Sequence, residues 1–429
     1  MSERDVSPLV DHLFRREAGR LVARLARRFG VARLDLVEDA VQDALLQACR
    51  TWPFRGIPDD PAAWIATAAT NRTLDLLRTG ARHARLLSGD GPPLDAHDPL
   101  LSAAAPQASV STDDAHELGD DELALLFACA HPALSSETAV ILMLKTVGGF
   151  GVREIARGLI AQPEAIAQRL VRARRTLADA QVPVAIPDAA GAAPRVQAVA
   201  DALYLMFTEG HSAAEADAII RSDLCHEALR LAIAVADHPA LARAELHALV
   251  ALMAFTAARL GTRVDDAGIP VLLAEQDRAR WNRGLLGLAL QRVELSMAAT
   301  ELSRWHVEAE LAAYHALAPT FDAMPWAQVV DAYDRLLVIA PSPVVRVNRA
   351  VALGFAVGPV AALDALDHAD DEGRLARYPW LHAARAHAYE RLGDGPGARG
   401  AWARALALTN SLPHRQFIER RLAALTSRL

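Results

Sequence analysis

Residues 134–180 read LSSETAVILMLKTVGGFGVREIARGLIAQPEAIAQRLVRARRTLADA, and their apolar spacing predicts three consecutive helices. The first helix stops at Gly148-Gly149, since glycine readily ends a helix. A turn near Ala161-Gln162 separates the second helix from the third, which starts with a proline in its first position. The inward residues of the short second helix are Ile155, Ala156 and Leu159. This spacing is typical of a helix-turn-helix.

The third helix of this motif has two distinct faces. Its inward stripe consists of Ile166, Leu170, Ala173 and Leu177. Its outward face consists of Glu164, Gln168, Arg172 and Arg175, with Arg169 and Arg174 on the flanks. Such side chains read base edges in the major groove, and flanking arginines suit phosphates. The pattern predicts binding to duplex DNA, and a solvated arginine-rich surface is the alternative.

Helical spacing extends through most of the 429 residues, and alternating strand patterns are nearly absent. We therefore expect an all-α protein. Stretches rich in Gly, Pro, Ser and Asp (88–121) or in proline (182–194) divide the chain. The predicted segments are a first domain at 1–87, a flexible acidic linker at 88–119, a second domain at 120–182, a helical extension at 195–325 and a repeat region at 326–429.

The net charge of −7 hides a segregation of charge along the chain. Residues 15–33 hold seven arginines and one glutamate, and residues 153–175 hold six arginines and two glutamates. Residues 86–122, by contrast, hold nine acidic and no basic side chains. Local basic segments therefore keep a nucleic-acid partner open despite the acidic total.

A helix predicted after Asp35 as its N-cap presents an unusual outer face. Its buried stripe is Val37, Val41, Ala44, Leu45 and Ala48. The opposite face presents Asp39, Gln42, Asp43, Leu46 and Arg50. An exposed leucine among acids suits contact with a basic protein partner, because the apolar centre supplies affinity and the charged rim steers association. An ordinary solvated face is the alternative.

The next helix is predicted to start at Asp60-Pro61, with Ile65, Ala69, Leu76 and Leu77 inward. One stripe of this helix contains Trp64, Thr67, Asn71, Asp75, Arg78 and Arg82. An indole can stack on a splayed base, and amides and guanidinium groups can read base edges. The alternative is that the tryptophan completes the core, with polar neighbours outside.

Several of these motifs, in this order, resemble the extracytoplasmic-function group of sigma-70 family factors. EDAVQDALLQA resembles the group's region 2.2, DPAAWIATAATNRTLDLLR its regions 2.3 and 2.4, and VREIARGLIAQPEAIAQRLVRARRTL its region 4.2. FACAHPALSSETAV, ALYLMFTEGHSA and LLAEQDRARWNRGL further resemble a long subgroup with a C-terminal tetratricopeptide-like extension. The implied fold is a region 2 helical bundle, a region 4 helix-turn-helix and a helical domain ending in repeats.

The resemblance assigns a partner to each surface. It implies that Asp39, Gln42, Asp43 and Leu46 dock on the β′ clamp helices of RNA polymerase, and that region 4 meets the β flap. The loop from Arg50 to Pro61, including Arg55, and the residues Trp64, Asn71, Asp75 and Arg78 would capture the melted minus-ten element. Glu164, Gln168, Arg169, Arg172 and Arg175 would read the minus-35 element. The acidic linker would thread toward the RNA exit channel. Ala167 departs from the pattern, because many group members place a lysine there.

The last quarter of the chain shows a repeat. Its small and aromatic positions are Ala386, Tyr389, Ala398, Trp402 and Ala405, with Gly393-Asp394 between the two helices. Ala350, Leu353, Ala362 and Ala369 repeat the spacing, and Tyr333 and Pro341 fit the end of another unit. Ala362 and Ala398 are 36 residues apart, close to a tetratricopeptide period of about 34. Stacked helix pairs of this kind usually bind peptide or protein, here possible regulatory partners.

Other chemistries have little support in the sequence. The three cysteines, Cys49, Cys129 and Cys225, lie far apart, so neither a disulfide framework nor a zinc-thiolate cluster is expected. Scattered polar residues such as Glu209, His211, His226, Glu227, His306, Glu310 and His315 lack a metal-ligand spacing, and no nucleotide or nucleophile motif occurs. We expect no cofactor, no metal and no catalytic residue. No signal peptide or run of about 18 apolar residues is visible, so we expect a cytoplasmic, non-membrane protein.

The sequence thus predicts an alternative sigma factor that binds core RNA polymerase, recognises minus-35 and minus-ten elements and is not an enzyme. A helix-turn-helix regulator with a peptide-sensing repeat domain is the alternative, since it would not need the two faces of the first domain. An enzyme on a helical scaffold would need a convergent acid-base or nucleotide site.

Overall fold

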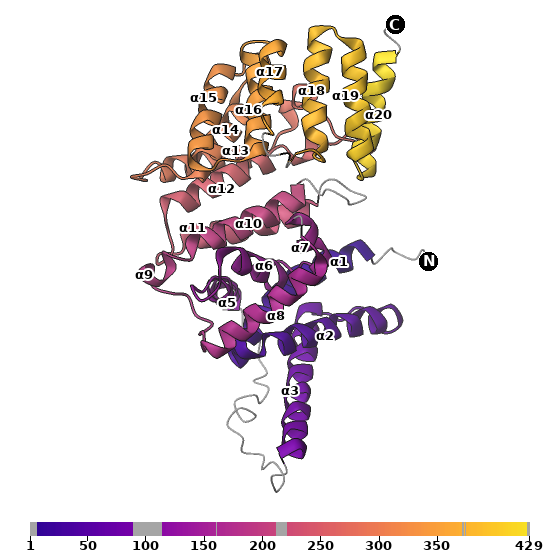
Figure 1. The fold of residues 1–429 in the computed structure, drawn as a ribbon. Coiled ribbons are helices and arrows are strands. Elements are labelled where there is room, and N and C mark those ends of the chain that lie inside the picture. The colour runs from indigo at the N-terminus through magenta and orange to yellow at the C-terminus, as the bar shows by residue number, and fades with distance from the viewer. Residues whose placement is uncertain are drawn as a thin grey trace. The chain divides into compact units, whose positions relative to one another are not determined.

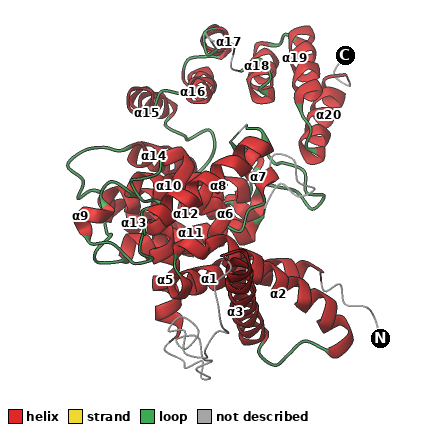
Figure 2. Cartoon of the chain, turned by 60° about the horizontal axis from the view of Figure 1, so that its bottom comes forward, coloured by secondary structure: helices red, strands yellow, loops and turns green. Residues whose placement is uncertain are grey.

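The computed structural model describes residues 7–88, 114–159, 161–211, 221–370, 373 and 375–426. Within these ranges the chain is helical, with turns and loops between helices, and Figure 2 shows no strand in them. One isolated antiparallel bridge joins Val264 to Pro270. The predicted all-α fold is confirmed, while most of the predicted linker lies outside the described residues.

The chain forms two compact units: unit 1 comprises Met1–Leu203 and Pro239–Leu241, and unit 2 comprises Tyr204–His238 and Ala242–Leu429. The helices of unit 1 are α1 (Ser7–Phe29), η1 (Val31–Arg33), α2 (Leu34–Arg55), α3 (Pro61–Ser88), α5 (Asp114–Cys129), α6 (Ser136–Thr146), α7 (Val152–Gly158), α8 (Pro163–Asp179), α9 (Ala189–Ala192) and the start of α10 (Val196–His211). Figure 1 labels the α-helices among them. The boundary predicted at residue 195 therefore falls inside unit 1.

Unit 2 contains the end of α10 and the rest of the described chain. Its helices are α11 (Ser222–Asp237), α12 (Ala244–Ala257), η2 (Leu260–Thr262), η3 (Leu273–Glu275), η4 (Arg278–Arg280), α13 (Arg283–Ser296), α14 (Arg304–Leu317), α15 (Trp326–Ile339), α16 (Pro343–Ala356), α17 (Pro359–Asp367), α18 (Pro379–Leu392), α19 (Gly395–Leu408) and α20 (Leu412–Thr426).

Helix α2 buries the stripe that its spacing predicts. Val37, Val41, Ala44 and Ala48 are each at most 1% exposed, and Leu45 is half-buried. The helix begins at Leu34, directly after η1, so Asp35 lies in its first turn and is not the N-cap. It also continues through Pro53 to Arg55, so the loop predicted from Arg50 is shorter than expected. Gly56 ends the helix with a φ of 84°, a conformation that glycine adopts without strain.

Helix α3 begins at Pro61, as predicted. The Asp60 carboxylate accepts a hydrogen bond from the backbone N–H of Ala63 at 2.9 Å, which satisfies one of the unpaired donors of the first turn. Ile65 and Ala69 are fully buried, whereas Leu76 and Leu77 are only half-buried. The helix packs on α2 and fixes which side of α2 remains in contact with solvent.

The predicted helix-turn-helix is present in α6, α7 and α8. Ser135 caps α6 by accepting a hydrogen bond from the Thr138 N–H, and Glu154 accepts one from the Gly151 N–H at the start of α7. The inward stripe of α8, Ile166, Leu170, Ala173 and Leu177, is buried throughout. Pro163 occupies the first turn of α8, since its missing N–H would have had no partner there.

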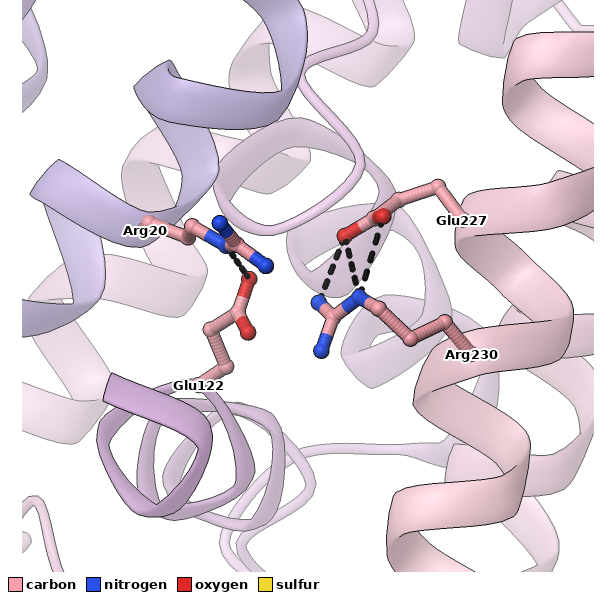
Figure 3. A network of polar contacts seen from close by, with 4 residues as sticks. All are labelled: Arg20, Glu122, Glu227 and Arg230. Carbon is pink, nitrogen blue, oxygen red and sulfur yellow. Dashed lines mark hydrogen bonds and ion pairs between the residues drawn. The ribbon is translucent and has the colours of Figure 1, made fainter. Parts of the chain in front are cut away.

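Contacts between α1 and α5 join helices α1 to α3 to helices α5 to α8 within unit 1. Arg27 of α1 pairs with Asp121 of α5 at 2.6 Å, and Arg20 pairs with Glu122 at 3.7 Å, a pair shown in Figure 3. Helix α5 begins at Asp114, so the end of the predicted flexible linker is helical. Asp121 and Glu122 are buried, and the sequence pattern had grouped them with the acidic stretch before them.

Unit 2 is built around α12, which is buried on nearly all sides and packs against α11, α13 and α14. The stretch Ala244–Thr262 is long and apolar enough to cross a membrane by length and composition, but most of it is buried in the structure. The core helix of a soluble protein passes the same test. Arg292 of α13, itself mostly buried, pairs through both terminal nitrogens with Asp237 of α11.

Helices α15 to α20 pack in succession. The predicted small positions Ala386, Ala398 and Ala405 are fully buried, and Trp402 is 4% exposed. Gly393 takes a left-handed conformation between α18 and α19, and the side chain of Asp394 caps α19. The predicted helix pair at 379–408 is therefore present. Elsewhere in unit 2, Glu227 and Arg230 of α11 form the other ion pair of Figure 3.

Candidate functional site

The outer face of α2 remains largely open. Asp39, Gln42 and Leu46 are exposed, and Leu46 shows 54% of its surface. Asp43 is half-buried, and one of its oxygens lies 2.7 Å from Nε of Arg72 on α3. The sequence did not reveal this pair, since Arg72 lies outside the stripe identified on α3. We call Asp39, Gln42, Asp43 and Leu46 the acidic α2 face; its apolar centre is exposed and one of its two carboxylates is paired.

Two exposed apolar side chains lie near the end of α2 and were not identified from the sequence. Phe54 shows 89% of its surface and Ile57 shows 53%, on either side of Gly56. Exposed apolar side chains that form a contiguous patch can mark a contact surface. The signal in the sequence was weak, because the segment reads as a Pro/Gly loop and periodicity does not apply there. Arg55 in this segment is also exposed.

On α3 the predicted stripe divides into two parts. Trp64 is half-buried and packs edge-to-face on Trp52, with ring centroids 5.7 Å apart. The alternative interpretation of Trp64, in which its indole completes the core, predicted this packing. Asn71, Asp75 and Arg78 are exposed, and Arg78 lies 3.4 Å from Asp75. The open part of the stripe is therefore polar, and the exposed aromatic ring of this region is Phe54 at the end of α2.

The outer face of α8 is exposed at Glu164, Gln168, Arg172 and Arg175, which we call the α8 outer face. Arg175 makes a long contact of 3.8 Å with Asp179 one turn later. Arg169, predicted to belong to this surface, is half-buried and pairs with Glu137 of α6. Ala167, where the resemblance places a lysine, is exposed. Four of the five predicted side chains are thus presented together along one helix.

Arg174 faces the other way. Its guanidinium reaches Asp35 at 2.7 Å and Glu38 at 2.5 Å, so α8 is tied to the start of α2. The Glu38 side chain is 9% exposed. Burial raises the pKa of Glu38 to about 7, and the nearby cations Arg174 and Lys145 oppose this rise. The sequence could not show that Glu38 and Arg174 meet, because they lie 136 residues apart and each is an ordinary polar residue of its own helix.

Helix α1 also approaches the end of α6 closely. A Cβ atom on Gly19 would lie 2.5 Å from the carbonyl oxygen of Val147, a distance that side chains do not tolerate. Gly19 is therefore required where these helices meet. Among the described residues no group of three or more His, Cys, Asp or Glu side chains could hold a metal ion.

Comparison with known proteins identifies the first part of unit 1. Residues 14–83, which include the acidic α2 face and α3, match sigma-70 region 2. The first part of the chain is therefore a sigma-70 region 2. Sigma-70 family proteins act in transcription initiation, binding RNA polymerase and recognising promoters, and they are not enzymes. The helix-turn-helix of α6 to α8 lies outside the matched residues.

The rest of the chain has relatives without an assigned role. Residues 195–297 match a family of unknown function, DUF6596. An uncharacterised protein of Rhizobium meliloti (strain 1021) is 36% identical over 392 residues, which cover 91% of this chain and 90% of that protein. The match therefore extends over both units. No solved structure matches the chain.

Proposed function

We propose that this protein is an alternative sigma factor of the sigma-70 family and of the extracytoplasmic-function type, acting in the cytoplasm, with a regulatory C-terminal domain. The observation that supports it most is the order of its parts. Sigma-70 region 2 at 14–83 is followed by a helix-turn-helix with an exposed arginine-containing face. A regulator that binds only duplex DNA would need the second of these parts and not the first.

In this proposal the acidic α2 face docks on the β′ clamp helices of core polymerase. Leu46 would supply the buried apolar contact, and Asp39 and Asp43 would pair with basic side chains of the partner. Because Asp43 already pairs with Arg72 at the surface, Asp39 is the carboxylate whose electrostatic contribution to docking should be largest.

Promoter recognition is assigned to two separate surfaces. Asn71, Asp75 and Arg78 of α3, with Arg55 and Phe54 at the end of α2, would hold the melted minus-ten element. Phe54 replaces Trp64 as the ring best exposed for stacking on a base. The α8 outer face would enter the major groove of the minus-35 element, with Arg172 and Gln168 at base edges.

The C-terminal helices are assigned a regulatory role. Residues 195–325 would form a helical extension and residues 326–429 a tetratricopeptide-like array, in which α16 with α17 and α18 with α19 are the helix pairs. Arrays of such pairs present an extended concave binding surface. In this proposal the acidic linker extends toward the RNA exit channel of polymerase, and region 4 contacts the β flap of polymerase.

Run-off transcription with purified core polymerase tests the proposal. We expect the full-length protein to direct initiation from a defined set of promoters, and Asp39→Arg to abolish both core binding and initiation. Glu301→Arg makes the same change of charge at an exposed residue of unit 2, and it should leave both unchanged. If the protein retards duplex DNA yet never directs initiation, the helix-turn-helix regulator is the better interpretation.

A further inference from the structure

Unit 2 contains a pocket of about 460 Å³ on one side of the α15 to α20 array. Its walls come from α14, α15, α16, α18, α19 and α20 and from the segment Leu272–Ala274. Pockets that hold drug-sized molecules have volumes of roughly 300–1,000 Å³ and are mostly apolar. The volume and composition of this pocket fall in that class.

Aromatic side chains are concentrated in this pocket. Phe, Trp and Tyr make up only 5% of the chain, yet three of its seven tryptophans, Trp326, Trp380 and Trp402, line the pocket. The ring of Trp326 stacks on Phe355 with centroids 4.4 Å apart and planes 18° apart. Phe321 meets both rings edge-on. Flat aromatic walls favour a flat ligand, because rings bind one another by offset stacking or edge contacts.

The chain itself closes one side of the pocket. Leu272 and Leu273 line it, and the loop that holds them is tied at both ends. At one end Asp265 pairs with Arg420 of α20 at 2.7 Å. At the other, Arg278 donates to the carbonyl oxygens of His315 and Ala318 at the end of α14. A groove between repeats would ordinarily admit an extended peptide, but here part of that space is filled by the chain's own loop.

The polar side chains that line the pocket are His315, Tyr333, Asn348, His387 and Arg421. Arg421 lines the pocket, and the guanidinium of Arg391 lies 4.5 Å from the ring of Phe355. Glu390 opposes them, pairing with Arg421 and accepting from the Trp402 indole. The Nδ1 atom of His315 is buried and has no hydrogen-bond partner among the described residues. Burial lowers the pKa of His315 to about 4, so the ring is neutral near pH 7.

We propose that this pocket binds a planar, mainly apolar small molecule with one anionic group, of the class of aromatic carboxylic or sulfonic acids. The aromatic walls would hold the ring system, and Arg421 would attract the acid group. The free Nδ1 of His315 offers one further hydrogen bond. This inference does not depend on the proposed sigma-factor function, since every residue that it uses lies in unit 2.

Two related probes separate the contributions of ring and charge. The anion 8-anilinonaphthalene-1-sulfonate becomes fluorescent in apolar sites, and N-phenyl-1-naphthylamine has the same ring system without the sulfonate. With the full-length protein we expect one saturable site for the anion and about tenfold weaker binding of the neutral probe. Arg421→Gln should remove this difference, because it deletes the cation. Equal affinities in the wild-type protein would overturn the assignment of an acid.

Filling the pocket tests its location. Ala384 of α18 lines the pocket, whereas Ala403 of α19 is exposed and serves as the matched control. We expect Ala384→Trp to reduce binding of the anionic probe at least tenfold and Ala403→Trp to leave it unchanged. Circular dichroism melting checks that both variants fold, and Val351→Trp narrows the pocket from α16 if Ala384→Trp does not. Unchanged binding in a folded pocket variant would overturn the proposal.

Competition in the wild-type protein distinguishes a small molecule from a peptide. We expect 1-naphthoate to displace the fluorescent anion and a phenylalanine-rich heptapeptide not to displace it. Displacement by the peptide alone would show that the pocket belongs to a peptide-binding groove, and the small-molecule assignment would then be wrong. This measurement needs no variant and remains decisive if none of the substituted proteins folds.

Discussion

The two sides of α2 carry ion pairs of opposite character. On the outer side, Asp43 and Arg72 are each almost half exposed. On the inner side, Glu38 and Arg174 are 9% and 15% exposed and join α2 to α8. Solvent weakens the first pair, whereas the second must offset the cost of removing two charges from water. The same helix therefore offers an exposed surface that can exchange partners and a buried contact that sets the position of α8.

The largest expected effect comes from breaking the buried pair. Arg174→Ala would leave Glu38 buried without its cation, and we expect the free energy of unfolding of unit 1 to fall by about 3 to 5 kcal/mol at pH 8. Arg175→Ala removes an exposed arginine from the next position and should change stability by less than about 0.5 kcal/mol. Chemical denaturation of both variants measures the difference. Similar values for the two would mean that the inner pair contributes no more than a surface pair.

The inner pair should also make stability depend on pH. The pKa of Glu38 is about 7 in the folded chain and 4.5 when unperturbed, so the folded state holds more protons between these values. The free energy of unfolding should therefore fall as pH rises from 4.5 to 7, by up to about 3 kcal/mol at 1.36 kcal/mol per pKa unit. Glu38→Gln should flatten this part of the profile. If the free energy of unfolding instead rises from pH 4.5 to 7 in the wild-type protein and not in Glu38→Gln, the raised pKa of Glu38 is contradicted.

Much of the fold could be predicted from local pattern. The stripe Ile166, Leu170, Ala173 and Leu177 is buried as its spacing predicted, and Asp60 caps α3. These features depend on neighbours within one or two helical turns. Helix α2 begins two residues earlier than predicted, because η1 precedes it directly and no cap side chain marks the boundary.

The parts that were not predicted depend on the approach of distant segments. Arg174 and Arg172 lie two positions apart and look alike in sequence, yet one pairs with α2 and the other is exposed. Trp64 could have stacked on a base or on the core, and its contact with Trp52 follows from the packing of α3 on α2. The pocket of unit 2 likewise requires a loop whose anchor, Asp265, is 155 residues from Arg420. Periodicity identifies the face of a helix but not the partner of a long side chain.

The next prediction concerns Arg172, which lies two positions before Arg174 and is exposed. Because Arg172 lies on the α8 outer face, Arg172→Ala should leave stability unchanged and weaken binding to the upstream promoter element by roughly 1 to 3 kcal/mol. Titration of polymerase complexes on matched and altered minus-35 sequences measures both the loss and the change in selectivity. A uniform loss on all sequences would indicate a phosphate contact rather than a base contact.

The smallest effect should come from the outer pair. Arg72→Ala removes the partner of Asp43, and because both side chains are nearly half exposed we expect the free energy of unfolding to change by about 0.2 to 1 kcal/mol. A double-mutant cycle with Asp43→Asn isolates the coupling from other effects of each substitution. The coupling should decrease with added salt, since solvent ions reach this pair and not Glu38 with Arg174.

A salt-independent coupling above about 2 kcal/mol would mean that the outer pair is structural too. Asp43 would then be held in place by Arg72 and could not exchange it for a basic side chain of polymerase, leaving Asp39 as the only carboxylate of the acidic α2 face able to do so.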